Sequence, residues 1–120
     1  MKKKSILIVD DEEIIRDFLF EVLSEDYKIS MATDGDEAIE QMQAQSFDLI
    51  ITDLKMPRVS GEEVVKYARD NDPDSKVIVI SGYSSLYTVS QSVNSGACAF
   101  LSKPFSIKEL LQAVSRAMGA

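Results

Sequence analysis

The chain has 120 residues, of which 45% are hydrophobic and 28% charged, and its formal net charge is -7. This composition predicts one soluble globular domain over residues 1–120 and argues against direct nucleic-acid binding, which needs clustered Lys and Arg. The sequence contains no histidine, which excludes Ser-His-Asp and Cys-His catalysis and histidine-ligated metals. No apolar run approaches the ~20 residues of a membrane span and no signal peptide is recognised, so a cytoplasmic protein without a membrane partner is expected.

Strands and helices are predicted to alternate along the chain. Short apolar runs bounded by turn signals predict buried strands, and a polar–apolar alternation predicts an edge strand at Lys28–Ala32. The other expected strands are 6–9, 49–52, 77–80 and 97–101. Apolar residues at helical spacing follow each strand, and the S-x-x-E pattern at Ser60 and Ser106 predicts two capping boxes. Five βα units imply an α/β fold, a doubly wound parallel sheet with helices on both faces.

The segment Ser84–Ser95 is an unusual helix. Its apolar residues have helical spacing, and Gly96 offers a C-terminal stop, but Ser, Thr and Asn dominate and are weak helix formers. It is either a marginal helix without special role or an element of low stability that can move. Shortly after it comes Cys98, the only cysteine, which excludes an intrachain disulfide and is expected to be buried in the core.

Polar residues follow the apolar runs where the strands end. Asp10 and Asp11 follow the first run, Asp53 the third, Ser81 the fourth and Lys103 the fifth. Because ligands of open α/β sheets bind at the carboxyl ends of the strands, these groups are expected to meet at one edge. Three carboxylates would favour a dication that prefers oxygen ligands, such as Mg²⁺, Mn²⁺ or Ca²⁺. Asp53 could then accept a phosphoryl group whose oxygens are held by Lys103 and Ser81.

Each of these residues also has a plainer interpretation. The acids at residues 10–13 favour a helix N-terminus through the helix dipole. Ser81 could simply form a turn before Gly82, and Lys103 could be a surface residue before Pro104. Taken singly, these motifs are therefore weak signals.

Together they resemble the receiver domain of two-component response regulators over essentially the whole chain. The matching stretches are ILIVDD at 6–11, DLKMPRVSG at 53–61, VIVISG at 77–82, GA at 96–97 and FLSKPF at 100–105. The resemblance implies the flavodoxin-like sheet order 2-1-3-4-5. It also implies a phosphoacceptor that catalyses only its own phosphoryl transfer and slow dephosphorylation, rather than an enzyme acting on a separate substrate.

The resemblance assigns roles to individual residues. Asp53 would take a phosphoryl group from a phosphohistidine of a sensor histidine kinase or a histidine phosphotransfer protein. Mg²⁺, or alternatively Mn²⁺, would be bound by Asp10, Asp11, Asp53 and the backbone carbonyl of Lys55. Ser81 and Lys103 would hold the phosphoryl oxygens.

The resemblance further implies a switch. Phe100 would turn inward as Ser81 moves towards the phosphoryl group, and the peptide bond before Pro104 would be cis. The surface of the fourth helix, fifth strand and fifth helix would then change its binding partner, which is a downstream target or an output domain. Dimerisation through the fourth and fifth helices is an open alternative. Segment 84–95 is therefore interpreted as an element of low stability that can move. Tyr83 is expected to shield the phosphoryl group partly from water.

Three other functions compete with this interpretation. A haloacid-dehalogenase-like phosphatase would need a second acid two residues after Asp53, where Lys55 stands. A nucleotide- or flavin-binding module would need a glycine-rich loop after a strand, and none is present. A degenerate receiver, acting as an unphosphorylated interaction domain, is the remaining alternative. A stand-alone regulator and the receiver part of a transcription factor or hybrid kinase are equally compatible with the sequence.

Overall fold

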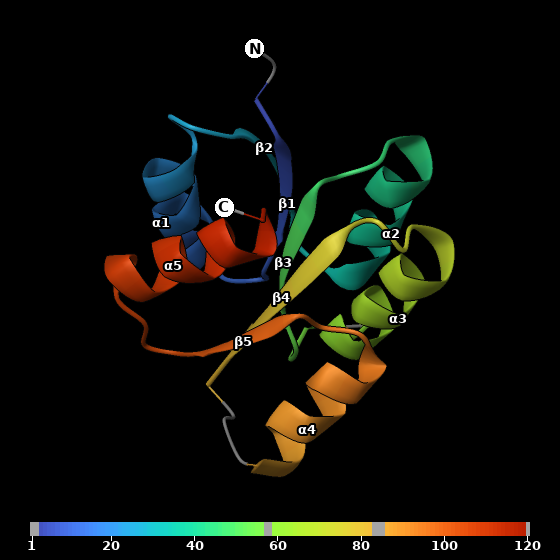
Figure 1. The fold of residues 1–120 in the computed structure, drawn as a ribbon. Coiled ribbons are helices and arrows are strands. Elements are labelled where there is room, and N and C mark those ends of the chain that lie inside the picture. Colours follow the sequence, from blue (N-terminus) through green and yellow to red (C-terminus); the bar gives the residue numbers. More distant parts are fainter. Residues whose placement is uncertain (1–2, 57–58, 83–85, 120) are drawn as a thin grey trace.

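The computed structural model describes residues 3–56, 59–82 and 86–119, with only the backbone of residues 86 and 87. In these ranges five strands alternate with five helices (Figure 1). The strands are β1 (Ser5–Val9), β2 (Lys28–Ala32), β3 (Leu49–Asp53), β4 (Lys76–Ser81) and β5 (Ala99–Ser102). The helices are α1 (Glu13–Leu23), α2 (Gly35–Ala44), α3 (Gly61–Asn71), α4 (Leu86–Ser95) and α5 (Ile107–Ala117).

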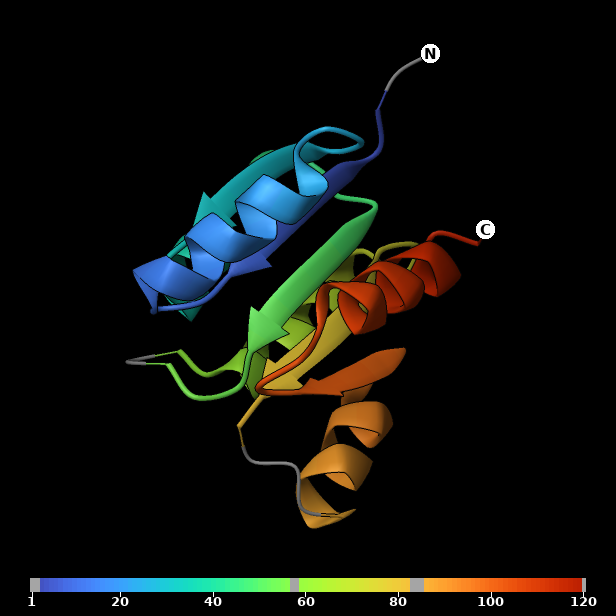
Figure 2. The same ribbon diagram turned by 90° about the vertical axis from the view of Figure 1, so that its left-hand side faces the viewer.

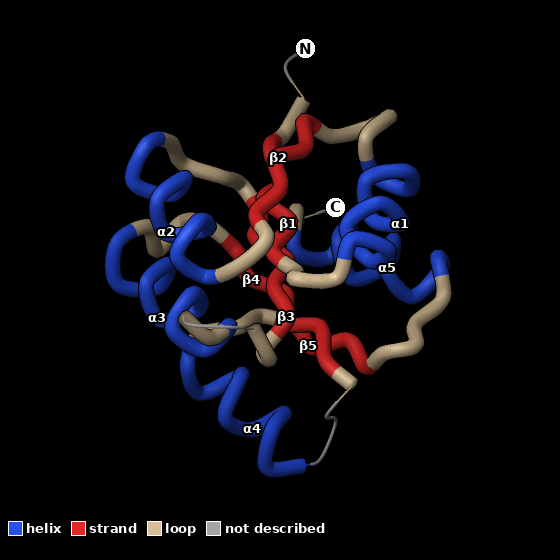
Figure 3. The backbone as a smooth tube through the Cα atoms, turned by 180° about the vertical axis from the view of Figure 1, so that it is seen from behind, coloured by secondary structure: helices blue, strands red, loops and turns tan. Residues whose placement is uncertain are grey.

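The strands form one parallel sheet in the order β2-β1-β3-β4-β5. The doubly wound α/β architecture and the order 2-1-3-4-5 are thus confirmed. Helices α1 and α5 cover one face of the sheet, and α2, α3 and α4 cover the other (Figures 1 and 3). Viewed from the α1 and α5 side, the strands run in one direction (Figure 2), so their carboxyl ends meet at one edge.

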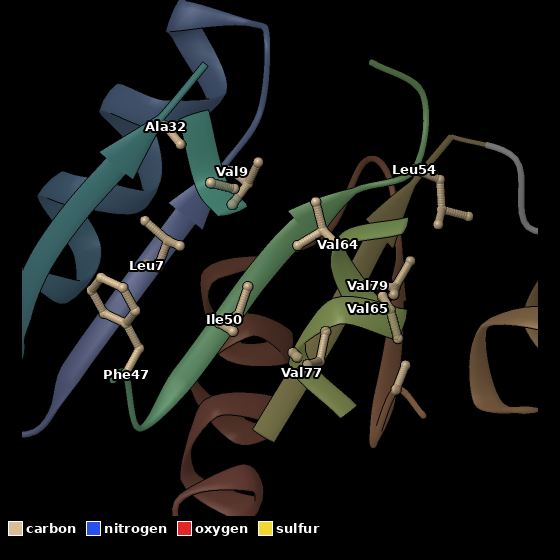
Figure 4. Close-up of a cluster of buried hydrophobic side chains, with 13 residues drawn as sticks. Leu7, Val9, Ala32, Phe47, Ile50, Leu54, Val64, Val65, Val77 and Val79 are labelled. Carbon is tan, nitrogen blue, oxygen red and sulfur yellow. The ribbon is translucent and has the colours of Figure 1, made fainter. Parts of the chain in front are cut away.

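Both faces of the sheet are buried, which explains the continuous apolar runs. Successive side chains of a strand point to opposite faces. Leu7 and Val9 therefore join the cluster under α2 and α3 (Figure 4), whereas Ile6 and Ile8 join the cluster under α1 and α5. A sheet that is covered on both sides needs apolar residues at every position, not only at alternate ones.

Among the helix starts that the structure describes, three have a side chain that accepts a backbone N–H. Asp34 caps α2, Ser60 caps α3 and Ser106 caps α5. The capping box predicted at Ser106 is confirmed in both halves, because the Glu109 carboxylate also accepts the Ser106 N–H. At Ser60 the structure shows the half in which the hydroxyl accepts the Glu63 N–H, at 3.4 Å.

Some apolar residues predicted to lie inside are exposed. The prediction that Cys98 is buried was wrong: its side chain is exposed. Cys98 lies just before β5, at the outer edge of the sheet, where it lines a surface groove with Lys76 and Arg116. Among the apolar residues at helical spacing after the first strand, Ile14 of α1 is 75% exposed, because the neighbouring Ile15 occupies the inward position.

Contacts at the C-terminal end of helix α4 tie it to the rest of the molecule. Ser92 is buried, whereas Val93 is 53% exposed. An Arg69 guanidinium nitrogen on α3 donates to the Ser95 carbonyl at 3.2 Å, and the Gly96 and Ala97 N–H groups close the last turn. Gly96 has φ +120°, which favours glycine and ends the helix as predicted. No helix in the described ranges is long and apolar enough to cross a membrane.

Candidate functional site

The carboxyl ends of β1, β3 and β5 bring acidic and basic side chains together. The Lys103 Nζ lies 3.2 Å from Asp10 Oδ2 and 3.3 Å from Asp53 Oδ2. These contacts arise because β1 pairs with β3, and Lys103 follows the end of β5. A third carboxylate, that of Glu12, lies 3.1 Å from the same ammonium. Sequence reasoning placed the first three residues in the site but gave Glu12 only a role at the helix terminus.

Four carboxylates crowd this edge of the sheet. One oxygen from each lies within 4.8 Å of the others, and the residues concerned are Asp10, Asp11, Glu12 and Asp53. Asp10 is fully buried and Asp53 is 5% exposed, whereas Asp11 and Glu12 are exposed. The cluster therefore has a buried floor and a solvent-facing rim. The Lys103 ammonium offsets only part of this negative charge.

The backbone fixes how the two buried acids point. The Glu12 N–H donates to Asp10 Oδ1 at 2.9 Å, and the Leu54 N–H donates to Asp53 Oδ1 at 2.8 Å. In each case the second oxygen faces Lys103. The Asp10 carbonyl also accepts from the Arg16 guanidinium at 2.8 Å, which ties the strand end to α1. One oxygen of each acid is thus anchored and the other is available to the site.

Burial dominates the electrostatics of the acids. It raises the pKa of Asp53 against the opposing effects of Lys103 and two backbone N–H groups. Burial also raises the pKa of Asp10, and the nearby Asp53 charge adds to this. Burial alone would lower the pKa of Lys103, but its hydrogen bond to Glu12 and the charges of Asp10 and Asp53 outweigh it and raise that pKa. Lys103 therefore stays charged, and the cluster favours a further cation.

Gly61 allows α3 to begin directly against the site. Its N–H donates to the Leu54 carbonyl at 3.1 Å. A Cβ at this position would lie 1.9 Å from the carbonyl oxygen of Asp53. The glycine of the 53–61 motif therefore has a steric reason: no side chain fits between the start of α3 and the strand end that carries Asp53.

The remaining predicted site residues lie around this centre. Ser81, the fully buried last residue of β4, follows Ile80, which pairs with Asp53, and its carbonyl accepts the Lys103 N–H at 2.9 Å. The Lys103–Pro104 peptide bond is cis. Phe100 is partly buried and packs against the cluster under α2 and α3. Lys55 is exposed, and Tyr83 lies outside the described residues.

Comparison with known proteins identifies this arrangement. Residues 6–115 match the family model of the response regulator receiver domain. The chain belongs to the response regulator receiver family. Receivers are signalling domains. A solved structure shows the same fold: a CheY-like receiver domain protein from Methanospirillum hungatei superimposes with a TM-score of 0.93 at 32% identity, and the match covers 98% of this chain and 95% of that one.

Curated relatives differ in how much of their length this receiver spans. The response regulator protein PilR of Pseudomonas aeruginosa is 36% identical over 98% of the chain, which covers only 27% of PilR. The sporulation initiation phosphotransferase F of Bacillus subtilis is 34% identical over 97% of the chain, which covers 94% of that protein. This receiver thus resembles both one part of a longer regulator and nearly the whole of a short protein.

Proposed function

We propose that this receiver is a phosphoacceptor in which Asp53 takes a phosphoryl group from a phosphohistidine of a partner kinase or phosphotransfer protein. The observation that carries the proposal is the position of Asp53. One of its oxygens is anchored by the Leu54 N–H, and the other faces the Lys103 ammonium at 3.3 Å beside three further carboxylates. This is a nucleophile held in place next to a group that can bind phosphoryl oxygens.

The transfer follows from the positions of these groups. A carboxylate oxygen of Asp53 attacks the phosphorus, the P–N bond to the donor imidazole breaks, and the freed imidazole nitrogen takes up a proton from solvent. The Lys103 ammonium pairs with one phosphoryl oxygen, and the Ser81 hydroxyl donates to another. Positioning and neutralisation of charge are most of what phosphoryl transfer requires.

The acidic residues fit a magnesium ion. Their hard carboxylate oxygens lie within 4.8 Å of one another, and burial has already raised the pKa of Asp10 and Asp53, which a cation would reverse. Asp10, Asp11, Asp53 and the carbonyl of Lys55 would hold Mg²⁺, with Mn²⁺ as a substitute. When bound, the ion supplies positive charge that shields Asp53 from the incoming phosphoryl oxygens.

The response to phosphorylation is proposed to travel through Ser81 and Phe100 to the surface of α4, β5 and α5. Phosphorylation adds at most about -2 charge, so it can bias only an element near balance. Helix α4 suits this role because it is rich in Ser, Thr and Asn, which are weak helix formers. The surface would engage a downstream target or output domain, or a second receiver. The similarity to a sporulation phosphotransferase also favours a relay in which the phosphoryl group is passed on.

The proposal is tested by intact-protein mass after incubation with acetyl phosphate, with and without Mg²⁺. A single phosphoryl adduct is expected only with Mg²⁺, and it should be absent from Asp53→Ala. Asp74→Ala is the matched control, because Asp74 is an exposed acid after α3 and should leave the adduct unchanged. An unmodified parent protein at every Mg²⁺ concentration would instead favour an unphosphorylated interaction domain.

A further inference from the structure

Glu12 stands at the start of α1 but does not cap it. The residues at the equivalent positions of α2, α3 and α5 each accept a backbone N–H with their side chains, whereas Glu12 makes no such bond. Ser, Thr, Asp and Asn are the preferred residues there. The Glu12 backbone is nevertheless fixed, since its N–H donates to Asp10 and its carbonyl accepts from Ile15 and Arg16. Its side chain is therefore free to act elsewhere.

That side chain reaches across the site to Lys103, with Oε1 3.1 Å from Nζ. An ammonium has three N–H donors. In this structure Asp10, Glu12 and Asp53 each accept a hydrogen bond from the Lys103 ammonium. A phosphoryl oxygen can gain one of these donors only by displacing a carboxylate.

Of the three carboxylates, Glu12 is the one that water can solvate when it leaves Lys103. The Asp10 and Asp53 side chains are 0% and 7% exposed, whereas the Glu12 side chain is 56% exposed. Phosphorylation converts Asp53 itself into an acyl phosphate, so Asp10 and Glu12 are the carboxylates that remain to compete for Lys103. Releasing the buried Asp10 leaves its charge without a partner, which is costly, but a released Glu12 is solvated at once. Of these two contacts, Glu12 is thus the one that yields when a phosphoryl group arrives.

We propose that Glu12 is a positioning residue that competes with the phosphoryl group for the Lys103 ammonium and so weakens the hold of the site on that group. The inference rests on the proposed phosphoacceptor function and adds a residue that sets its strength. Removing the Glu12 charge frees one donor of Lys103 and removes a negative charge that repels the incoming oxygens. The phosphorylated state should then be favoured.

The test is the affinity for beryllofluoride, a phosphoryl mimic, at saturating Mg²⁺ in the parent, Glu12→Gln and Glu13→Gln proteins. Saturation is established by a Mg²⁺ titration of each protein. Glu12→Gln is expected to bind about two- to five-fold more tightly, the range that a half-exposed ion pair supports. Glu13→Gln removes the same charge from the next residue, which is exposed and forms no ion pair with Lys103 in the described structure, and should bind like the parent.

A spectroscopic signal separates this role from a purely structural one. The ¹H–¹³C resonance of the Lys103 ε-methylene group, recorded without beryllofluoride, should move in Glu12→Gln and stay in place in Glu13→Gln. Equal beryllofluoride affinity in all three proteins, or equal tightening in both variants, would overturn the role of Glu12 and leave the phosphoacceptor proposal intact. A parent protein that binds no beryllofluoride would overturn the phosphoacceptor proposal, and this inference with it.

Discussion

Replacing Gly61 by alanine is expected to destabilise the protein by about 2 kcal/mol. The new Cβ would lie 1.9 Å from the Asp53 carbonyl oxygen, 1.5 Å short of the 3.4 Å at which ordinary contact begins, and 2.7 Å from the Leu54 Cα. Both neighbours are backbone atoms that cannot rotate away, so the free-energy cost should lie near the upper end of the range for overpacked sites, about 3 kcal/mol. Alanine recovers at most about 1 kcal/mol through helix propensity and a less flexible unfolded chain.

Urea unfolding followed by circular dichroism measures this difference. Gly82→Ala is the matched control, because a Cβ at Gly82 would meet nothing within 4 Å and its φ is not in the left-handed range. That variant should stay within about 0.5 kcal/mol of the parent protein. A Gly61→Ala protein as stable as Gly82→Ala would refute the argument that α3 begins in steric contact with the strand end bearing Asp53.

Three further predictions concern the acids and helix α4. Burial raises the pKa of Asp53, so its contribution to stability is fully present below the ordinary value of 3.8 and is lost as pH rises through the raised folded value. Without Mg²⁺, the stability of Asp53→Asn relative to the parent should therefore increase from pH 3.5 to pH 7 by urea unfolding, and a pH-independent difference would contradict this. Mg²⁺ should raise the thermal midpoint of the parent protein, and at 100 times its Kd it should add about 2.7 kcal/mol to the free energy of unfolding. The Asp11→Asn protein should need more Mg²⁺ for the same rise. In the absence of Mg²⁺ it should be as stable as the parent, because Asp11 is exposed. Arg69→Ala removes the hydrogen bond to the Ser95 carbonyl and should lower the free energy of unfolding by about 1 kcal/mol. Relative to the parent, its amide hydrogen exchange should accelerate more in α4 than in α2. Unchanged exchange in α4 would show that this contact does not anchor the helix.

The fold was predictable because its signals are local. The short apolar run Ile6–Val9, followed by two acids, predicted a buried strand, and its side chains join the two cores in alternation. Asp10 and Asp53 could be placed together because parallel strands end at a common edge, and the structure puts both beside Lys103. The sequence thus indicated the centre of the site from the ends of its strands.

The features of the site that could not be predicted from the sequence depend on contacts between residues far apart in the chain. Glu12 and Lys103 are 91 positions apart, and only the folded chain shows that the acid at the start of α1 reaches across to the ammonium. Gly61 ends the motif at 53–61, but its contact with the Asp53 carbonyl requires the packing of α3 against β3. Cys98 was misplaced because an apolar neighbourhood does not reveal which side chains at the edge of the sheet face the solvent.

The most direct test of the central claim is to locate the modification. The protein is incubated with acetyl phosphate and Mg²⁺, reduced with borohydride, which converts an aspartyl phosphate into homoserine, and digested for peptide mass spectrometry. We predict homoserine at position 53 only, dependent on both Mg²⁺ and the phosphoryl donor. Homoserine at another acid of the cluster, such as Asp10 or Asp11, with Asp53 intact, would contradict the assignment of Asp53 as the phosphoacceptor.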